Sequence, residues 1–224
     1  MKYTTLLLDL DETLFDFAKS ERYAIDRLME KYGIPVSDGN RKLYSEINAS
    51  KWRKLEMGEI TRPQLFRERF EDFFGKTHVE ADAAEANIAY MQFLSQASFI
   101  LDGALEVCEK LSKKYALYLV TNGTKIVQNG RLNGSPIMKF IKDVFISEEI
   151  GFNKPQKEYF DYVLEHIGER DKSKILVVGD SLSSDIAGAM NSGLDSCWVN
   201  RNNQKTDVVP TYTICDITEL LNIL

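Results

Sequence analysis

The feature that most constrains this chain is a short apolar run at residues 4–8 that ends abruptly in the acidic stretch DLDE. Continuous apolar runs of this kind are typical of parallel strands that are buried on both faces of a sheet. Similar runs end in small or acidic residues at 116–120, 144–146 and 175–178, and a further short strand is expected at 196–199. The pattern therefore predicts a parallel sheet.

Helical patterns separate these runs. Leu105, Cys108 and Leu111 recur at intervals of three, and apolar residues repeat with helical spacing between residues 159 and 167. Alternation of strand and helix is typical of an α/β protein with a doubly wound, Rossmann-like parallel sheet. We therefore expect helices on both faces of the sheet.

The segment after the first strand breaks this alternation. Residues 16–99 are dominated by helical apolar stripes, separated by breaks at Gly33-Ile34-Pro35, Gly58 and Gly75. We expect an α/β core formed by residues 1–15 and 100–224, with a helical subdomain of residues 16–99 inserted into it.

Composition restricts the possible partners. The net charge of −6 repels polyanions, so the chain is not expected to bind a nucleic-acid polymer. No apolar run approaches the roughly 20 residues of a membrane helix, and no membrane association is expected. Three widely spaced cysteines without a CxxC pair predict neither a disulfide framework nor a zinc site, and favour the cytoplasm. We expect a monomer or a weak homodimer.

Polar residues gather where the predicted strands end. Ligands of open α/β sheets bind beyond the carboxyl ends of the strands, where the loops converge. The residues expected to converge there are Asp9, Asp11, Thr121, Asn122, Lys154, Asp180 and Asp185.

Each of these motifs has a simpler interpretation when it is taken alone. Thr121-Asn122-Gly123 resembles an ordinary strand-ending turn, and a serine of GDSLSSD could cap a helix. The DxD start of a calcium loop also occurs, but Leu14 and Ser20 stand where that loop requires glycine and glutamate. The order of the motifs, each after a predicted strand, favours a shared site.

The motifs DLDET, TNG, KP and GDSLSSD, in this order and with a helical insert after the first, resemble the haloacid dehalogenase (HAD) superfamily with a helical C1-type cap. The resemblance covers nearly the whole chain. The stretches WRKLEMGEITRPQLFRERF, ISEEIGFNKP and CWVNRNN are most similar to the pyrimidine 5′-nucleotidase branch. The resemblance implies a phosphatase acting on a small phosphorylated metabolite.

The resemblance also implies roles for the motif residues. Asp9 would be the nucleophile that forms an aspartyl phosphate, and Asp11 the general acid and base. Mg²⁺ would be held by Asp9, the backbone carbonyl of Asp11 and Asp180, with Asp185 contributing directly or through water. The transferred phosphoryl group would be bound by Thr121, backbone N–H groups near Asn122, and Lys154.

We expect Mg²⁺-dependent hydrolysis of phosphomonoesters, with nucleoside 5′-monophosphates, especially pyrimidine ones, as substrates. Asp11 favours phosphate substrates, because related dehalogenases lack an aspartate at this position. Alternatives are a phosphatase or phosphomutase for another small metabolite, such as phosphoglycolate or a sugar phosphate. A receiver-like switch that stores an aspartyl phosphate without turnover is a third possibility, but it has no need of a long helical insert.

Two residues of the insert are candidates for substrate recognition. Trp52 could stack on a base, although core packing is the general expectation for aromatic residues here. Arg69 could meet a sugar or phosphate, but a solvated helix face is the simpler interpretation. The segment QNGRLNGSPIM at 128–138 departs from the related sequences, and its glycines and proline predict a shortened or kinked helix at the outer wall of the pocket.

Overall fold

A parallel sheet forms the centre of the α/β core. Among residues 2–224, which the computed structural model describes, six strands pair in the order β3-β2-β1-β4-β5-β6, and every pairing is parallel. The strands are β1 (Thr5–Leu8), β2 (Ala116–Thr121), β3 (Asp143–Ile146), β4 (Ile175–Gly179), β5 (Asp195–Val199) and β6 (Tyr212–Ile214). The sequence patterns predicted the first five of these and missed β6, which is only three residues long.

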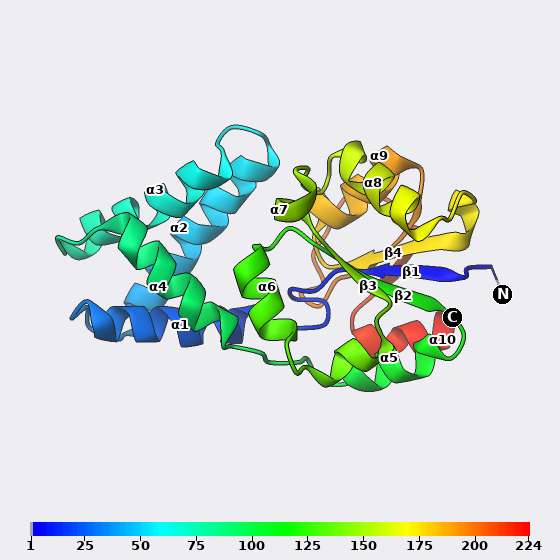
Figure 1. Cartoon of the computed structure of the whole chain (residues 1–224), viewed down its shortest axis with the longest axis horizontal. Helices are drawn as coiled ribbons and strands as arrows, with labels where there is room; N and C mark the ends of the chain where they lie inside the picture. The colour runs from blue at the N-terminus through cyan, green and yellow to red at the C-terminus, as the bar shows by residue number, and fades with distance from the viewer. Residues whose placement is uncertain (1) are drawn as a thin grey trace.

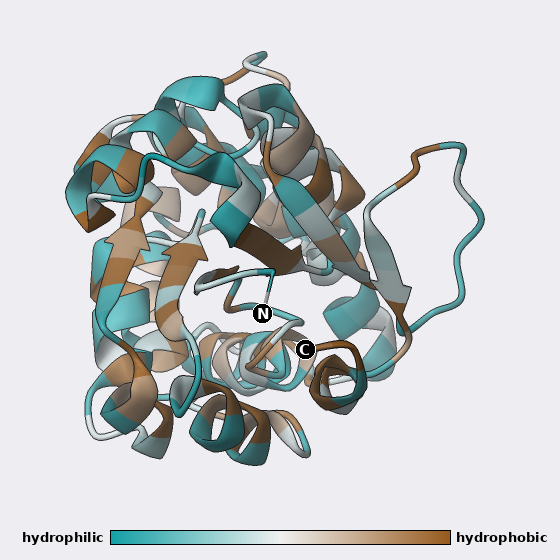
Figure 2. Cartoon of the chain, turned by 90° about the vertical axis from the view of Figure 1, so that its right-hand side faces the viewer, coloured by the Kyte–Doolittle hydropathy of each residue, from teal (hydrophilic) through white to brown (hydrophobic). Residues whose placement is uncertain are grey.

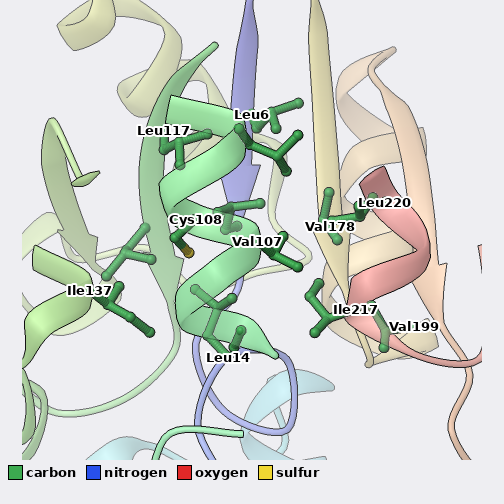
Figure 3. Close-up of a cluster of buried hydrophobic side chains, with 14 of the residues drawn as sticks. Leu6, Leu14, Val107, Cys108, Leu117, Ile137, Val178, Val199, Ile217 and Leu220 are labelled. Carbon is green, nitrogen blue, oxygen red and sulfur yellow. The ribbon is translucent and has the colours of Figure 1, made fainter. Parts of the chain in front are cut away.

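The alternation of side chains along β1 divides the core into two layers. Leu6 and Leu8 pack with helix α5 (Ala104–Ser112), whereas Leu7 faces the opposite layer with α8 (Lys157–Ile167). Figure 3 shows the first layer, where α5 and α10 (Leu220–Ile223) cover the strands. Figure 2, viewed from the side opposite the insert, shows the apolar strands between helices. The doubly wound fold is therefore confirmed.

The helical insert follows β1 and has its own apolar centre. Its helices are α1 (Phe17–Lys31), α2 (Asp38–Glu56), α3 (Arg62–Thr77) and α4 (Ala83–Ser95). Aromatic rings dominate that centre, where Tyr44 stacks on Phe70 at a centroid distance of 5.6 Å and also contacts Phe73 and Tyr90. Figure 1 shows this bundle beyond the end of the sheet.

The first insert helix is capped by acidic residues. The Asp16 carboxylate accepts a hydrogen bond from the Lys19 N–H at 2.7 Å, and the Glu12 carboxylate accepts one from the Ala18 N–H at 2.7 Å. Carboxylates at this end also interact favourably with the helix dipole. One acidic residue of the DLDE stretch, Glu12, therefore serves to begin the insert.

The helix after β2 is short, as its glycines and proline predict. Helix α6 (Lys125–Leu132) ends before Asn133, and Pro136 then begins a separate 3₁₀ turn, η1 (Pro136–Phe140). Although α6 belongs to the core by sequence, it packs beside α4 (Figure 1). Its residue Val127 joins the apolar cluster of the insert. A Cβ atom on Gly130 would lie 2.6 Å from the Cβ of Ser95, so only glycine allows this approach.

The remaining helical segments complete the core: α7 (Ser147–Ile150), η2 (Lys172–Lys174), a π-helical turn η3 (Leu182–Ile186), α9 (Ala187–Ser192) and η4 (Ile217–Glu219). Within the described residues, none of the helices has both the length and the apolar character to cross a bilayer. Cys108, Cys197 and Cys215 are all free thiols.

We predict that Ile25→Ala, in the apolar centre of the insert, lowers the free energy of unfolding by about 2 to 5 kcal/mol, because it leaves a cavity in a packed cluster. Ile88→Ala on α4 is the matched control, since Ile88 is 58% exposed, and should change the value by less than about 0.5 kcal/mol. Urea titration followed by circular dichroism measures both values. Equal effects of the two substitutions would show that the cluster does not stabilise the insert.

Candidate active site

The carboxyl ends of the strands open into one cavity of about 500 Å³ between the core and the insert. The structure brings together all the core residues expected from the sequence, and each lines this cavity: Asp9, Asp11, Thr121, Asn122, Lys154, Asp180 and Asp185. The strand order explains the convergence, because β1 lies between β2 and β4 and each contributes the residues that follow it. Trp52 and Arg69 line the cavity from the insert.

Lys154 is the buried cation of the site. Its ammonium group donates hydrogen bonds to Asp9 Oδ1 and Asp185 Oδ1, both at 2.6 Å, and to the Val120 carbonyl at 2.9 Å. Burial by itself lowers the pKa of Lys154, but the charges of Asp185 and Asp9 outweigh burial and raise the pKa. Lys154 therefore stays protonated at neutral pH and holds two carboxylates in place.

The carboxylates exceed the charge that Lys154 can balance. Oxygen atoms of Asp9, Asp180 and Asp185 all lie within 4.8 Å of one another. Burial is the main cause of the raised pKa values of Asp9 and Asp180, and repulsion from the neighbouring carboxylates raises both further. When all three carboxylates are ionised, two negative charges remain after pairing with Lys154. One divalent cation would balance them. This set of hard oxygen donors fits Mg²⁺.

The loops around Lys154 are held by Asn122 and Thr121. The Asn122 amide accepts a hydrogen bond from the Lys154 N–H at 2.8 Å and donates one to the Lys154 carbonyl at 2.9 Å. The Asn122 side chain therefore positions the lysine loop. Thr121 is buried, and its hydroxyl oxygen accepts a hydrogen bond from the Gly123 N–H at 3.0 Å.

Asp11 contacts two residues that were not predicted as parts of the site. Gln128 Nε2 donates to Asp11 Oδ2 at 2.9 Å, and the Arg131 guanidinium forms an ion pair with Asp11 Oδ1. A Cβ atom on Gly123 would lie 2.1 Å from Gln128 Nε2, so glycine makes room for this side chain. Both residues come from the segment expected to form only the outer wall. The spacing of three between Gln128 and Arg131, on the helix that follows TNG, is the signal that could have identified them.

Trp52 lies next to a bridge between the insert and the core. The Arg62 guanidinium lies 5.7 Å from the Trp52 ring centroid, and burial lowers the pKa of Arg62. Arg62 donates to the Asn122 carbonyl at 3.2 Å, to Ser147 Oγ at 2.9 Å and to Asn153 Oδ1 at 2.6 Å. The insert is thereby connected to the loop that carries Lys154.

Arg69 is buried, so the expectation of a solvated helix face is wrong. Its guanidinium donates to Asn48 Oδ1 at 3.1 Å and to Asn87 Oδ1 at 2.6 Å, while Asn48 donates to Glu21 Oε1 at 2.8 Å. Burial raises the pKa of Glu21, whereas hydrogen bonds and Arg69 oppose that shift. A polar network with both donors and acceptors thus lines the insert side of the cavity.

The comparisons with known proteins agree with this geometry. A family model described as haloacid dehalogenase-like hydrolase matches residues 3–193. The chain belongs to the haloacid dehalogenase-like hydrolase family. The expectation of an enzyme of this superfamily is therefore confirmed.

Three relatives match over nearly the full length of both chains. YfnB of Bacillus subtilis, named as a HAD-hydrolase, is 39% identical over 100% of this chain and 96% of its own. The pyrimidine 5′-nucleotidase PynA of Streptococcus pneumoniae is 33% identical over 100% of this chain and 96% of its own. The pyrimidine 5′-nucleotidase YjjG of Escherichia coli is 32% identical over 100% and 99%. The resemblance to the nucleotidase branch is confirmed.

A solved structure supports the fold assignment. The crystal structure of YfnB bound to magnesium, described as revealing interdomain movement, has a TM-score of 0.95 at 38% identity and covers 100% of this chain and 99% of that one. A dehalogenase structure at 18% identity has a TM-score of 0.77 over 99% of this chain and 97% of its own, and shows that the fold is shared.

We predict that Lys154→Met destabilises the protein by about 3 to 5 kcal/mol at neutral pH, because it leaves the Asp9 and Asp185 carboxylates buried without their cation. Because the pKa of Lys154 is raised in the folded chain, its contribution to the free energy of unfolding is fully present below the pKa of lysine in the unfolded chain. That contribution is lost only as the pH rises past the folded-state pKa. Urea titration at neutral pH measures the loss.

Lys157→Met is the matched control, since Lys157 forms only an exposed ion pair with Asp161. It should cost less than about 1 kcal/mol. If both substitutions cost the same, Lys154 does not balance the buried carboxylates.

Proposed function

We propose that the protein is a Mg²⁺-dependent phosphomonoesterase whose preferred substrates are pyrimidine nucleoside 5′-monophosphates. The observation that carries the proposal is the cluster of Asp9, Asp180 and Asp185, in which buried Asp9 and Asp185 pair with Lys154, with Asp11 beside it. Because dehalogenases share the fold, the chemistry must be argued from the site. The excess negative charge at this site would be balanced by a divalent cation. Such a cation next to a nucleophile and a second carboxylate favours phosphoryl transfer.

In the first step, an Asp9 oxygen attacks phosphorus and the ester P–O bond breaks. The departing oxygen keeps the bonding electron pair and takes a proton from Asp11, which leaves an aspartyl phosphate. In the second step, water attacks the same phosphorus and gives a proton to Asp11. The bond to Asp9 breaks, which releases inorganic phosphate and restores both carboxyl groups.

Asp9, Asp180 and Asp185 would hold the metal, together with the backbone carbonyl of Asp11. The bound ion supplies positive charge that allows an anionic nucleophile to approach an anionic ester. Lys154 and Thr121 would bind the phosphoryl oxygens, with help from backbone N–H groups near Asn122. Since the Asn122 side chain is engaged with the lysine loop, its part is to position Lys154.

The insert side of the cavity suits a nucleoside. It combines apolar and aromatic residues with the polar network of Glu21, Asn48 and Arg69. A ring could stack on Trp52 while the network hydrogen-bonds its polar edge, with Arg69 orienting Asn48. A cavity of about 500 Å³ is also much larger than a two-carbon ester such as phosphoglycolate requires. The activities named for PynA and YjjG support the same substrate class.

We further propose that residues 16–99 act as a cap over a core formed by residues 1–15 and 100–224. The bridge made by Arg62 and the bond from Ser183 Oγ to Glu56 Oε2 at 2.9 Å connect the two parts at the cavity. We also propose a monomer or weak homodimer in the cytoplasm, and the free thiols of the described chain are consistent with that compartment.

Phosphate release from a substrate panel tests the function. We expect UMP, dTMP and CMP to be hydrolysed with higher kcat/KM than AMP, ribose 5-phosphate or phosphoglycolate. EDTA should abolish activity, added Mg²⁺ should restore it, and Asp9→Asn should give no turnover because it removes the nucleophile. Activity on sugar phosphates with none on pyrimidine nucleotides would overturn the substrate assignment. Full activity in EDTA would overturn the role of the metal.

We predict that Trp52→Ala raises KM for UMP by about 5- to 150-fold, which corresponds to the 1 to 3 kcal/mol of a stacked base. The kcat/KM for ribose 5-phosphate, which has no base, should change less than about twofold. Met57→Ala is the control at the end of the same helix, since Met57 is 66% exposed and does not line the cavity. Equal losses with UMP and ribose 5-phosphate would contradict stacking on Trp52.

A further inference from the structure

Helix α6 holds both carboxylate oxygens of Asp11. Arg131 pairs with Asp11 Oδ1, and Gln128 Nε2 donates to Asp11 Oδ2 at 2.9 Å. The two α6 side chains are also joined to each other, since Arg131 donates to Gln128 Oε1 at 3.1 Å. Gln128 Nε2 lies 2.9 Å from Thr121 Oγ1, which connects this group to the end of β2. The orientation of Asp11 is therefore set by α6.

The other side of Arg131 meets both segments that connect the insert with the core. On the outgoing segment, its guanidinium lies 5.2 Å from the Phe15 ring and 6.0 Å from the Phe17 ring. On the returning segment, Arg131 Nε donates to the Ala97 carbonyl at 3.2 Å, and Ser98 Oγ donates to the Arg131 carbonyl at 2.7 Å. One side chain thus spans the Asp11 carboxylate and both connections.

The two connecting segments are joined directly as well. Ser20 Oγ lies 2.7 Å from the Asp16 carbonyl and 3.0 Å from the Ala97 carbonyl, and Phe15 forms a backbone bridge with Ile100. A shift of the insert that moves one segment therefore moves the other. Because Arg131 contacts both connecting segments, a shift of either segment displaces its side chain.

Burial prevents Arg131 from leaving these partners freely. Its side chain has no exposed surface, and a buried guanidinium without a carboxylate partner is strongly unfavourable. The planar guanidinium also fixes the direction of each donated bond, so the Ala97 contact and the Asp11 contact constrain one another. A displacement at Ala97 must then reorient the Asp11 carboxylate or break a buried contact.

We propose that Arg131 is a positioning residue that aligns the Asp11 carboxylate to accept the proton of the attacking water only while the insert is seated on the core as in this structure. The proposal rests on the proposed function, in which Asp11 serves both steps. Arg131 does not touch the reacting atoms and acts through Asp11. Misplacing a catalytic group by about 1 Å can cost on the order of 100-fold in rate, so alignment is a sufficient control.

The choice of leaving group separates positioning from general structural damage. An alkoxide leaving from UMP needs the proton of Asp11, whereas p-nitrophenolate is a stable anion that leaves without one. Water attack on the aspartyl phosphate needs Asp11 with either substrate. A variant with misaligned Asp11 should therefore form the aspartyl phosphate normally from p-nitrophenyl phosphate and then hydrolyse it slowly.

The test compares Arg131→Lys and Arg131→Gln with the wild type in the presence of Mg²⁺. We expect kcat for UMP to fall about 10- to 100-fold, with KM changed less than about threefold. With p-nitrophenyl phosphate, rapid mixing should show a burst of one p-nitrophenol per enzyme within about threefold of the wild-type rate, followed by slow turnover. Arg67→Gln is the matched control, because Arg67 is exposed and pairs only with Glu71.

Ser98→Ala tests the connection to the insert without changing the charge beside Asp11. It should lower kcat for UMP about two- to fivefold and leave KM unchanged. The substitution is mild because Ser98 is exposed, so it keeps the proposal testable if the Arg131 variants do not fold. Circular dichroism and Mg²⁺ titration identify folded variants.

If the wild type is active, three results would overturn the inference. They are a higher KM with unchanged kcat in the Arg131 variants, a first turnover of p-nitrophenyl phosphate slowed as much as kcat for UMP, and no effect of Ser98→Ala. If the wild type releases no phosphate from any ester, the proposed function itself fails. The two failures are therefore distinguishable.

Discussion

The charge balance around buried Lys154 is the interaction on which the site depends. A buried ammonium group needs negative partners, and buried carboxylates repel one another unless cations separate them. Lys154 meets both needs for Asp9 and Asp185, and the remaining negative charge accounts for the fit to a divalent cation. The acidic end of β1 is thus stable only because segments distant in sequence bring compensating charge to it.

Helix α6 gives the molecule its second organising feature. It belongs to the core by chain connection, yet it packs on α4 and contributes Val127 to the apolar cluster of the insert. The same helix supplies Gln128 and Arg131 to Asp11. The position of the insert and the orientation of Asp11 are therefore linked through one helix. The close contact between α6 and α4 that makes this link requires a glycine on α6.

Local sequence patterns predicted the features that depend on neighbouring residues in the chain. The first five strands were predictable because buried parallel strands are continuously apolar, and the short α6 was predictable from its glycines and proline. Strand β6 was missed because three residues carry too little pattern. Gln128, Arg131 and Arg62 were missed as parts of the site, because a polar residue on a helix is ordinarily solvated unless a distant segment buries it.

By itself, the sequence determined the α/β class, the inserted helical bundle and the set of motif residues that meet at the strand ends. Those features follow from residue spacing and from the rule that parallel strands present their carboxyl ends at one edge. Only the tertiary structure decided that Asn122 holds the lysine loop, that Arg69 is buried in a polar network and that Arg131 reaches Asp11. Such contacts join residues far apart in the chain, and their partners are chosen by packing and charge in three dimensions.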